Sequence, residues 1–115
     1  MVKVSELLQN NKIKEVLLND LKASFSAISY LDQQKIIIAY EPIWAIDSDT
    51  IPTNKEIEET TEFIKGIFPN NIVLYGGGVT SNNIYELSQI KTVDGFLLGR
   101  LGNNINELEE FLKNI

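Results

Sequence analysis

The sequence contains no cysteine and no histidine among its 115 residues. Without cysteine the chain can form neither a disulfide nor a thiolate metal site. Without histidine it lacks the commonest zinc ligand and the usual general base near neutral pH. Any acid–base chemistry must therefore come from carboxylates, lysine or tyrosine, and we expect neither a metal nor another cofactor.

Basic residues are also scarce, since 10 Lys and Arg stand against 16 Asp and Glu, a formal net charge of −6. Proteins that bind nucleic acid rely on Lys and Arg to neutralise phosphates, so a nucleic-acid partner is not expected. No apolar run approaches the roughly 20 residues that cross a bilayer, and the start MVKVSELLQNNK has no signal-peptide hydrophobic region. We expect a soluble, cytoplasmic protein without a membrane partner.

The first quarter of the chain has a helical pattern. Apolar residues recur every three or four positions between Val4 and Ile28, with Asn10-Asn11 as an interruption, which predicts a short turn and then a long helix. The following stretch KIIIAY, residues 35–40, is an apolar, β-branched run without polar alternation. Such runs are typical of parallel strands covered on both faces.

The rest of the chain repeats a strand–helix unit. Residues 53–56, TNKE, have the spacing of a capping box and predict a helix start. NIVLY (71–75) predicts a second strand and leads to a helix capped near Thr80; DGFLLG (94–99) predicts a third strand. The expected inner faces of the three helices are Ile57, Thr60, Ile64, Ile67 and Phe68; Ile84 and Leu87; and Ile105, Leu108, Phe111, Leu112 and Ile115.

The order α-βα-βα-βα predicts an α/β fold with three parallel strands joined by helical crossovers. No linker or low-complexity stretch divides the chain, so residues 1–115 are expected to form a single domain. Three parallel strands leave two open edges with unpaired backbone groups. We therefore expect something else to complete the sheet.

One carboxylate stands out in the stretch YEPIWAIDSDT, residues 40–50. Glu41 follows the first predicted strand and is restricted by Pro42, which places it at the carboxyl edge where α/β folds keep their chemistry. A surface glutamate satisfied by nearby amides is the plain alternative. Trp44 fits either an ordinary core position or the hinge of a moving loop.

Glycines follow the next two predicted strands. The amides of Gly76-Gly77-Gly78 can face an anion, although three glycines also make an ordinary tight turn. Gly99-Arg100-Leu101-Gly102 follows the last strand in the same way, and barrels of the (β/α)8 type often bind phosphate between their last two such loops. Arg100 could clamp that phosphate, but a solvated surface position is slightly favoured.

The stretches AYEPIWAI, YGGGVT and VDGFLLG, in this order, resemble the last part of the triosephosphate isomerase family. The resemblance covers nearly the whole chain, from a fifth-helix-like segment through the eighth βα unit, and YEPIWAI is its most specific run. It implies a partial (β/α)8 TIM barrel and an isomerase that interconverts dihydroxyacetone phosphate and glyceraldehyde 3-phosphate in glycolysis and gluconeogenesis. The implied substrate is a triose phosphate.

The resemblance also implies roles for single residues. Glu41 matches the base that moves a proton between two substrate carbons, in a family that is itself a standard example of a carboxylate base under a water-excluding lid. The implied phosphate-binding positions are Asp47, Gly77, Gly78, Gly99 and Arg100. The implied lid consists of Pro42, Ile43, Trp44, Ala45, Ile46, Asp47, Ser48, Asp49 and Thr50.

Three positions depart from the family pattern. The lid tip, usually glycine, threonine, glycine and lysine, reads DSDT from Asp47 to Thr50, and the Asp47 carboxylate would repel the substrate phosphate and weaken closure. Gly78 replaces the usual serine and loses its hydroxyl. Arg100 replaces a usual glycine, so its side chain must swing away or contact the phosphate.

The family's other catalytic residues, a lysine after the first strand and a histidine after the fourth, belong to a half that this sequence does not contain. We therefore expect a carboxyl-terminal fragment that is active only with an amino-terminal half. The alternative is a non-catalytic phosphate-binding or barrel-completing module that could associate as a homodimer. A free-standing isomerase with rewired catalysis is the least favoured interpretation.

Overall fold

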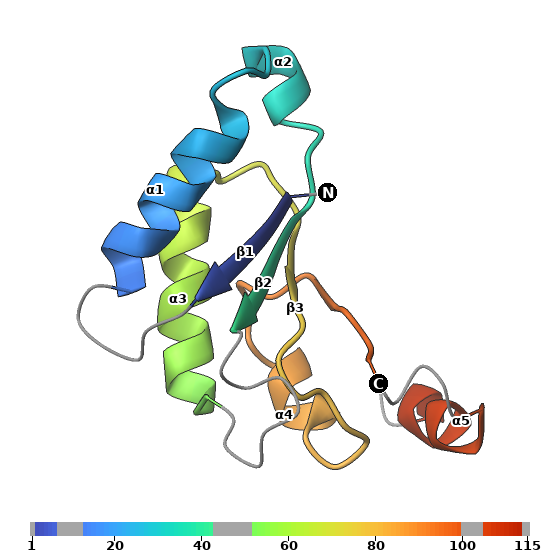
Figure 1. Cartoon of the computed structure of the whole chain (residues 1–115). Helices are drawn as coiled ribbons and strands as arrows, with labels where there is room; N and C mark the ends of the chain where they lie inside the picture. The colour runs from blue at the N-terminus through green and yellow to red at the C-terminus, as the bar shows by residue number, and fades with distance from the viewer. Residues whose placement is uncertain (1, 7–12, 43–51, 100–104, 114–115) are drawn as a thin grey trace.

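A parallel sheet forms the centre of the molecule in a computed structural model that describes residues 2–6, 13–42, 52–99 and 105–113 (Figure 1). Its four strands lie in the order β1-β2-β3-β4. They are β1 (Val2–Glu6), β2 (Ile38–Pro42), β3 (Val73–Tyr75) and β4 (Gly95–Phe96). The predicted fold class, a partial α/β barrel, is confirmed, and β2, β3 and β4 are the three predicted strands.

The fourth strand, β1, corrects the prediction that a helical pattern begins at Val4. Residues Val2–Glu6 pair in parallel with β2, with Val4 opposite Tyr40 and Glu6 opposite Pro42. The sequence VKVSE alternates apolar and polar residues, which is the period of a strand, but five residues are too few to outweigh the helical spacing that follows. The predicted interruption at Asn10-Asn11 lies outside the described residues.

Helices connect the strands as the crossover rule requires. They are α1 (Ile13–Phe25), the short α2 (Tyr30–Gln33), α3 (Asn54–Ile67), α4 (Ile84–Ser88) and α5 (Ile105–Lys113). Helices α1 and α3 lie side by side against the sheet (Figure 1), and the rings of Phe25 and Phe68 at their ends are 4.6 Å apart. Helix α2, capped by the Ser29 hydroxyl, was not predicted.

The core lies between the sheet and these helices. Ile38, Ala39 and Tyr40 are all buried, which confirms that β2 is covered on both faces. The rings of Tyr40 and Tyr75, cross-strand partners in β2 and β3, are 5.8 Å apart. The other buried apolar residues of the core are Leu21, Phe25, Ile57, Ile64, Val73, Val79, Ile84, Leu87 and Ile90.

All three predicted strands begin later than expected, and β2 extends beyond its predicted end to include Glu41 and Pro42. Ahead of β2 and β3, hydrogen bonds from a side chain take the place of hydrogen bonds between strands. The buried Asn71 donates from Nδ2 to the carbonyl oxygens of Gln33 at 2.7 Å and Ile36 at 2.8 Å. The carbonyls ahead of β2 are therefore satisfied by an amide side chain and not by a neighbouring strand.

Helix α3 begins as predicted. The Thr53 hydroxyl accepts from the Glu56 amide and the Glu56 carboxylate accepts from the Thr53 amide, both at 3.1 Å, so the capping box is confirmed. Of the predicted inner face, Ile57, Thr60 and Ile64 are buried, whereas Ile67 is exposed. The buried Thr61, which was not predicted, donates to the Ile57 carbonyl.

Helix α4 starts at Ile84 and not near Thr80. The Asn83 side chain bonds to the Thr80 amide and the Gly78 carbonyl, which keeps residues 80–83 in a turn. The predicted inner face is confirmed, since Ile84 and Leu87 are buried.

The predicted inner stripe of α5 is wrong in part. Ile105 and Leu112 are 76% and 61% exposed, and only Leu108 packs against the core. The side chain of Phe111, and Ile115, lie outside what the structure describes. Helix α5 stands beyond β4 at the side of the sheet (Figure 1), so most of its apolar stripe finds no core within the described part of the chain.

Candidate active site

Glu41 lies in β2 near the carboxyl end of the sheet, opposite Ser5 of β1. Its side chain is partly buried, and its Oε2 atom is fully buried. A carboxylate withdrawn from water is a stronger proton acceptor than one in solution, because burial disfavours its charged form. Because Glu41 lies within β2 and not after it, its backbone is paired with the neighbouring strand β1.

Pro42, the residue after Glu41, packs against the first glycine loop. A Cβ atom added to Gly77 would lie 2.7 Å from Cγ and 2.9 Å from Cδ of Pro42, so the proline ring packs directly on the Gly77 backbone. The Tyr75 hydroxyl closes the other side and donates to the Gly77 carbonyl at 2.6 Å. The carboxylate and the glycine loop therefore belong to the same carboxyl rim of the sheet.

Hydrogen bonds fix the glycine loop from both ends. The Gly76 amide donates to the Tyr40 carbonyl at 3.0 Å, which extends the pairing of β3 with β2. Gly78 is exposed and has a positive φ of 77°, a conformation that glycine adopts at little cost. Beyond it, Asn83 holds the Gly78 carbonyl and the Thr80 amide, each at 2.8 Å.

The second glycine loop approaches the same rim. The Leu97 amide donates to the Tyr75 carbonyl at 2.9 Å, and a Cβ on Gly76 would lie 3.0 Å from the Leu97 Cβ. Two residues later Gly99 is exposed, and an added Cβ would meet no atom of the described residues within 4 Å. The structure thus brings Glu41, Gly77 and Gly78 to one edge, and Gly99 follows β4 at the carboxyl end of the same sheet.

Several predicted site residues lie outside the described part of the chain. They are Arg100 and the lid residues Ile43, Trp44, Ala45, Ile46, Asp47, Ser48, Asp49 and Thr50. Pro42, the first residue of the predicted lid, is described and buried. Beyond the lid, the Asn54 side chain at the start of α3 donates to the Glu86 carboxylate of α4 at 3.0 Å.

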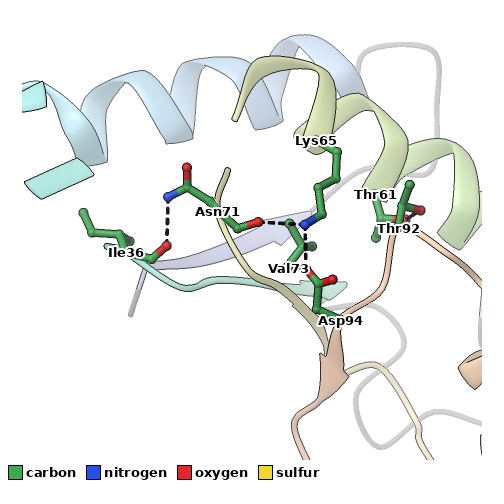
Figure 2. A network of polar contacts seen from close by, with 7 residues as sticks. All are labelled: Ile36, Thr61, Lys65, Asn71, Val73, Thr92 and Asp94. Atoms are coloured by element: carbon green, nitrogen blue, oxygen red, sulfur yellow. Dashed lines mark hydrogen bonds and ion pairs between the residues drawn. The ribbon is translucent and has the colours of Figure 1, made fainter. Parts of the chain in front are cut away.

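A polar network that was not predicted holds the opposite, amino end of the strands (Figure 2). Lys65 of α3 donates from Nζ to Oδ2 of Asp94 at 2.6 Å and to the Asn71 carbonyl at 2.8 Å. The same Asp94 oxygen accepts from the Val73 amide at 2.8 Å, and the Thr61 and Thr92 hydroxyls are 2.6 Å apart. This end of a parallel barrel serves stability and not chemistry.

The pKa of Asp94 is shifted by this network. Burial of the carboxyl works to raise the pKa, but hydrogen bonds from Lys65 and the Val73 amide, with the Lys65 charge, outweigh it and hold the pKa below its usual 3.8. The only advance signal for the network was an acidic residue, Asp94, at the start of the predicted strand 94–99. Similarly, Tyr75 precedes and Asn83 follows the loop Gly76–Gly78 in sequence, but nothing in their spacing predicted their hydrogen bonds to the Gly77 and Gly78 carbonyls.

Among the described residues, no group of three or more Asp, Glu, His or Cys side chains is arranged to hold a metal ion. None of the described helices combines the length and apolar character needed to span a membrane. The described part of the candidate site comprises the Glu41 carboxylate, the loop Gly76–Gly78 and Gly99.

The sequence profile of the family described as triosephosphate isomerase matches residues 3–115. The chain belongs to the triosephosphate isomerase family. It is 40% identical over 105 residues to the triosephosphate isomerase of Mycoplasma mobile, covering 90% of this chain and 43% of that protein. It is 36% identical over 124 aligned residues to that of Orientia tsutsugamushi, covering all of this chain and 49% of the relative.

A third relative, the triosephosphate isomerase of Borreliella burgdorferi, is 39% identical over 99 residues, covering 78% of this chain and 39% of its own length. The chain therefore spans about half, or less, of the curated triosephosphate isomerases that it matches. The four-stranded sheet agrees with this proportion, because a (β/α)8 barrel has eight strands.

Proposed function

We propose that this chain supplies the carboxyl-terminal part of a triose-phosphate isomerase, with the glutamate base, the lid and the phosphate-binding loops. The observation that carries the proposal is the packing of Pro42 on Gly77, which brings the strand end that carries Glu41 next to the glycine loop on one rim. The reaction belongs to glycolysis and gluconeogenesis, so the cytoplasm is the expected compartment. Residues 1–115 are then a single incomplete barrel segment.

In the proposed reaction, the Glu41 carboxylate removes a proton from the substrate carbon next to the carbonyl. The electron pair moves onto the carbonyl oxygen to form an enediolate, a hydroxyl proton passes from one substrate oxygen to the other, and the same carboxyl group returns its proton to the neighbouring carbon. The partly buried position of Glu41 favours this role, because a carboxylate in a water-poor pocket accepts a proton more readily. Proton transfer by a positioned base is worth about 10²–10⁴-fold in rate.

The glycine loops are proposed to hold the substrate phosphate. No described group accepts a hydrogen bond from the amides of Gly77, Gly78 or Val79, so these donors are available to an anion. Helix α4 has only five residues, so we attribute phosphate binding to the loop amides and not to a helix dipole. Gly99, Arg100 and the lid residue Asp47 complete the proposed phosphate site, with Asp47 opposing an anionic ligand.

The proposed partner is an amino-terminal half that pairs with the outer strands β1 and β4 and brings the missing lysine and histidine. A second copy of this chain is the alternative occupant of these edges, in which case the product would be a phosphate-binding module without isomerase activity. Both occupants would pair with the same two edges.

The test is turnover of glyceraldehyde 3-phosphate by the chain mixed with the amino-terminal half of the Mycoplasma mobile relative. We expect turnover only in the mixture, and about a 10³-fold loss with Glu41→Gln. Glu62→Gln, which changes an exposed glutamate of α3, is the matched control and should leave the rate unchanged.

Absence of turnover under conditions where the two halves associate and fold would count against the isomerase proposal. Phosphate binding without turnover would favour the non-catalytic module. Turnover by the chain alone, lost with Glu41→Gln, would instead support a free-standing isomerase.

A further inference from the structure

Asn83 contacts the glycine loop at two points, although it lies five residues beyond Gly78. Its Nδ2 atom donates to the Gly78 carbonyl and its Oδ1 atom accepts from the Thr80 amide, both at 2.8 Å. Only this orientation of the side-chain amide makes both bonds, because a carbonyl accepts and an N–H donates. The side chain therefore braces the loop from residue 78 to residue 80.

The usual reason for an asparagine at this position does not apply. Asn83 immediately precedes α4, where an asparagine side chain normally caps the first helical amides. Here it makes no capping hydrogen bond to α4. Its hydrogen-bonding capacity is directed to the loop instead, which is the part of the chain proposed to bind phosphate.

The brace determines where a loop amide points. In a planar trans peptide the N–H of one residue points opposite to the carbonyl of the residue before it. By holding the Gly78 carbonyl, Asn83 sets the direction of the Val79 amide. The Tyr75 hydroxyl does the same for the Gly78 amide through the Gly77 carbonyl.

We infer that Asn83 is a positioning residue for anion binding: it acts through the Gly78 carbonyl to orient loop amides toward the phosphate of the substrate. The inference rests on the proposed function, since it assigns a role within that phosphate site. Asn83 itself does not contact the ligand.

The test compares Asn83→Asp and Asn83→Ser with the same changes at Asn82, an exposed neighbour of the same residue type. Asp and Ser keep an oxygen that can accept from the Thr80 amide but cannot donate to the Gly78 carbonyl in the same way, so the turn before α4 is retained. Asn82→Asp controls for adding a negative charge near the site.

The probe is inorganic phosphate, titrated by calorimetry into the chain, alone and with the amino-terminal half. We expect phosphate to bind about tenfold more weakly to either Asn83 variant, the loss caused by one misplaced hydrogen bond. The Asn82 variants should bind within about twofold of the parent. The amide NMR signals of Gly78 and Val79 should shift with phosphate in the parent and less in the Asn83 variants.

Melting temperatures without phosphate show whether each variant is folded, and Asn83→Ser replaces Asn83→Asp if the added charge prevents folding. Equal phosphate affinity in the Asn83 and Asn82 variants, while the parent binds, would overturn the inference and leave the proposed function intact. If the parent binds no phosphate in either form, the phosphate site of the proposed function fails, and the role of Asn83 fails with it.

Discussion

At the scale of single residues, Gly77 is confined between the Tyr75 hydroxyl and the Pro42 ring. The loop and the strand that carries Glu41 approach so closely that even a methyl group has no room there. A Cβ added to Gly99, on the second loop, would meet no neighbour within 4 Å in the described part of the chain. Gly77 and Gly99 have the same implied role, but packing excludes a larger side chain only at Gly77.

Gly77→Ala should destabilise the fold by about 1–3 kcal/mol, because the added methyl overpacks a closed contact. Gly99→Ala is the matched control and should change the free energy of unfolding by no more than about 0.5 kcal/mol. Urea denaturation of both variants measures the difference. Equal stability of the two variants would contradict the close contact between Pro42 and the glycine loop.

Asp94→Asn tests the network at the amino end of the strands. The substitution keeps an oxygen for the Val73 amide but removes the charge next to Lys65, so we expect a loss of roughly 1 kcal/mol at pH 7. The 35% exposure of the Asp94 side chain limits the effect through solvent screening. Because the folded-state pKa lies below 3.8, this stabilisation is present above that pH and is lost as the pH falls through the folded-state pKa.

The measurement is the unfolding free energy of wild type and Asp94→Asn between pH 7 and pH 3. The difference between the two proteins should shrink as the pH falls below about 3.8. A difference that stays constant over this range would show that the Asp94 charge contributes nothing.

At the scale of helices and strands, local patterns predicted the elements whose own residues carry a clear signal. The capping box at Thr53 and the apolar faces of α3 and α4 depend on residues three or four positions apart, and all were visible in the sequence. Strand β1 depends on pairing with residues 36 positions away, and the turn before α4 depends on the Asn83 side chain bonding back to the loop. The alternation in β1 is only five residues long, and the Asn83 contact leaves no periodic signal.

The same reasoning explains the partial failure at α5. Helical periodicity predicts that α5 has an apolar face, but it does not specify which surface that face contacts. Within the described residues only Leu108 reaches the core, because α5 lies beyond the last strand. The outer side of β4 is where another strand of a complete barrel would lie.

Thr53→Ala should destabilise the chain by about 1 kcal/mol, because it removes the hydroxyl that accepts from the Glu56 amide at the start of α3. Thr53→Ser retains that oxygen and should be close to wild type. Thermal unfolding followed by circular dichroism distinguishes them. If alanine and serine are equivalent, the capping box does not stabilise α3.

At the scale of the whole molecule, the sheet of the described residues has two outer strands, β1 and β4. Four strands are half the number in the barrel of the family to which the chain belongs. The rim that carries Glu41 and the glycine loops is likewise part of a ring of loops. The proposed isomerase site thus needs both the geometry of this chain and the strands that close the barrel.

Adding the amino-terminal half should slow amide hydrogen exchange in β4, because a new neighbouring strand would protect its outer edge. Gly95 reports on that edge, because the Asp94 amide before it faces β3 and successive amides of a strand alternate in direction, whereas Leu74 of the inner strand β3 serves as the internal control. Unchanged exchange in β4, in a mixture shown to associate, would place the contact elsewhere on the molecule.

The most direct test of the account is proton transfer by Glu41. Dihydroxyacetone phosphate is incubated in D₂O with the chain joined by the amino-terminal half, and deuterium at the carbon next to the carbonyl is measured by proton NMR. We expect incorporation with the parent chain and with Glu62→Gln, and loss of about 10³-fold with Glu41→Gln. Deuterium incorporation at the same rate in the Glu41→Gln protein would contradict the assignment of this carboxylate as the base.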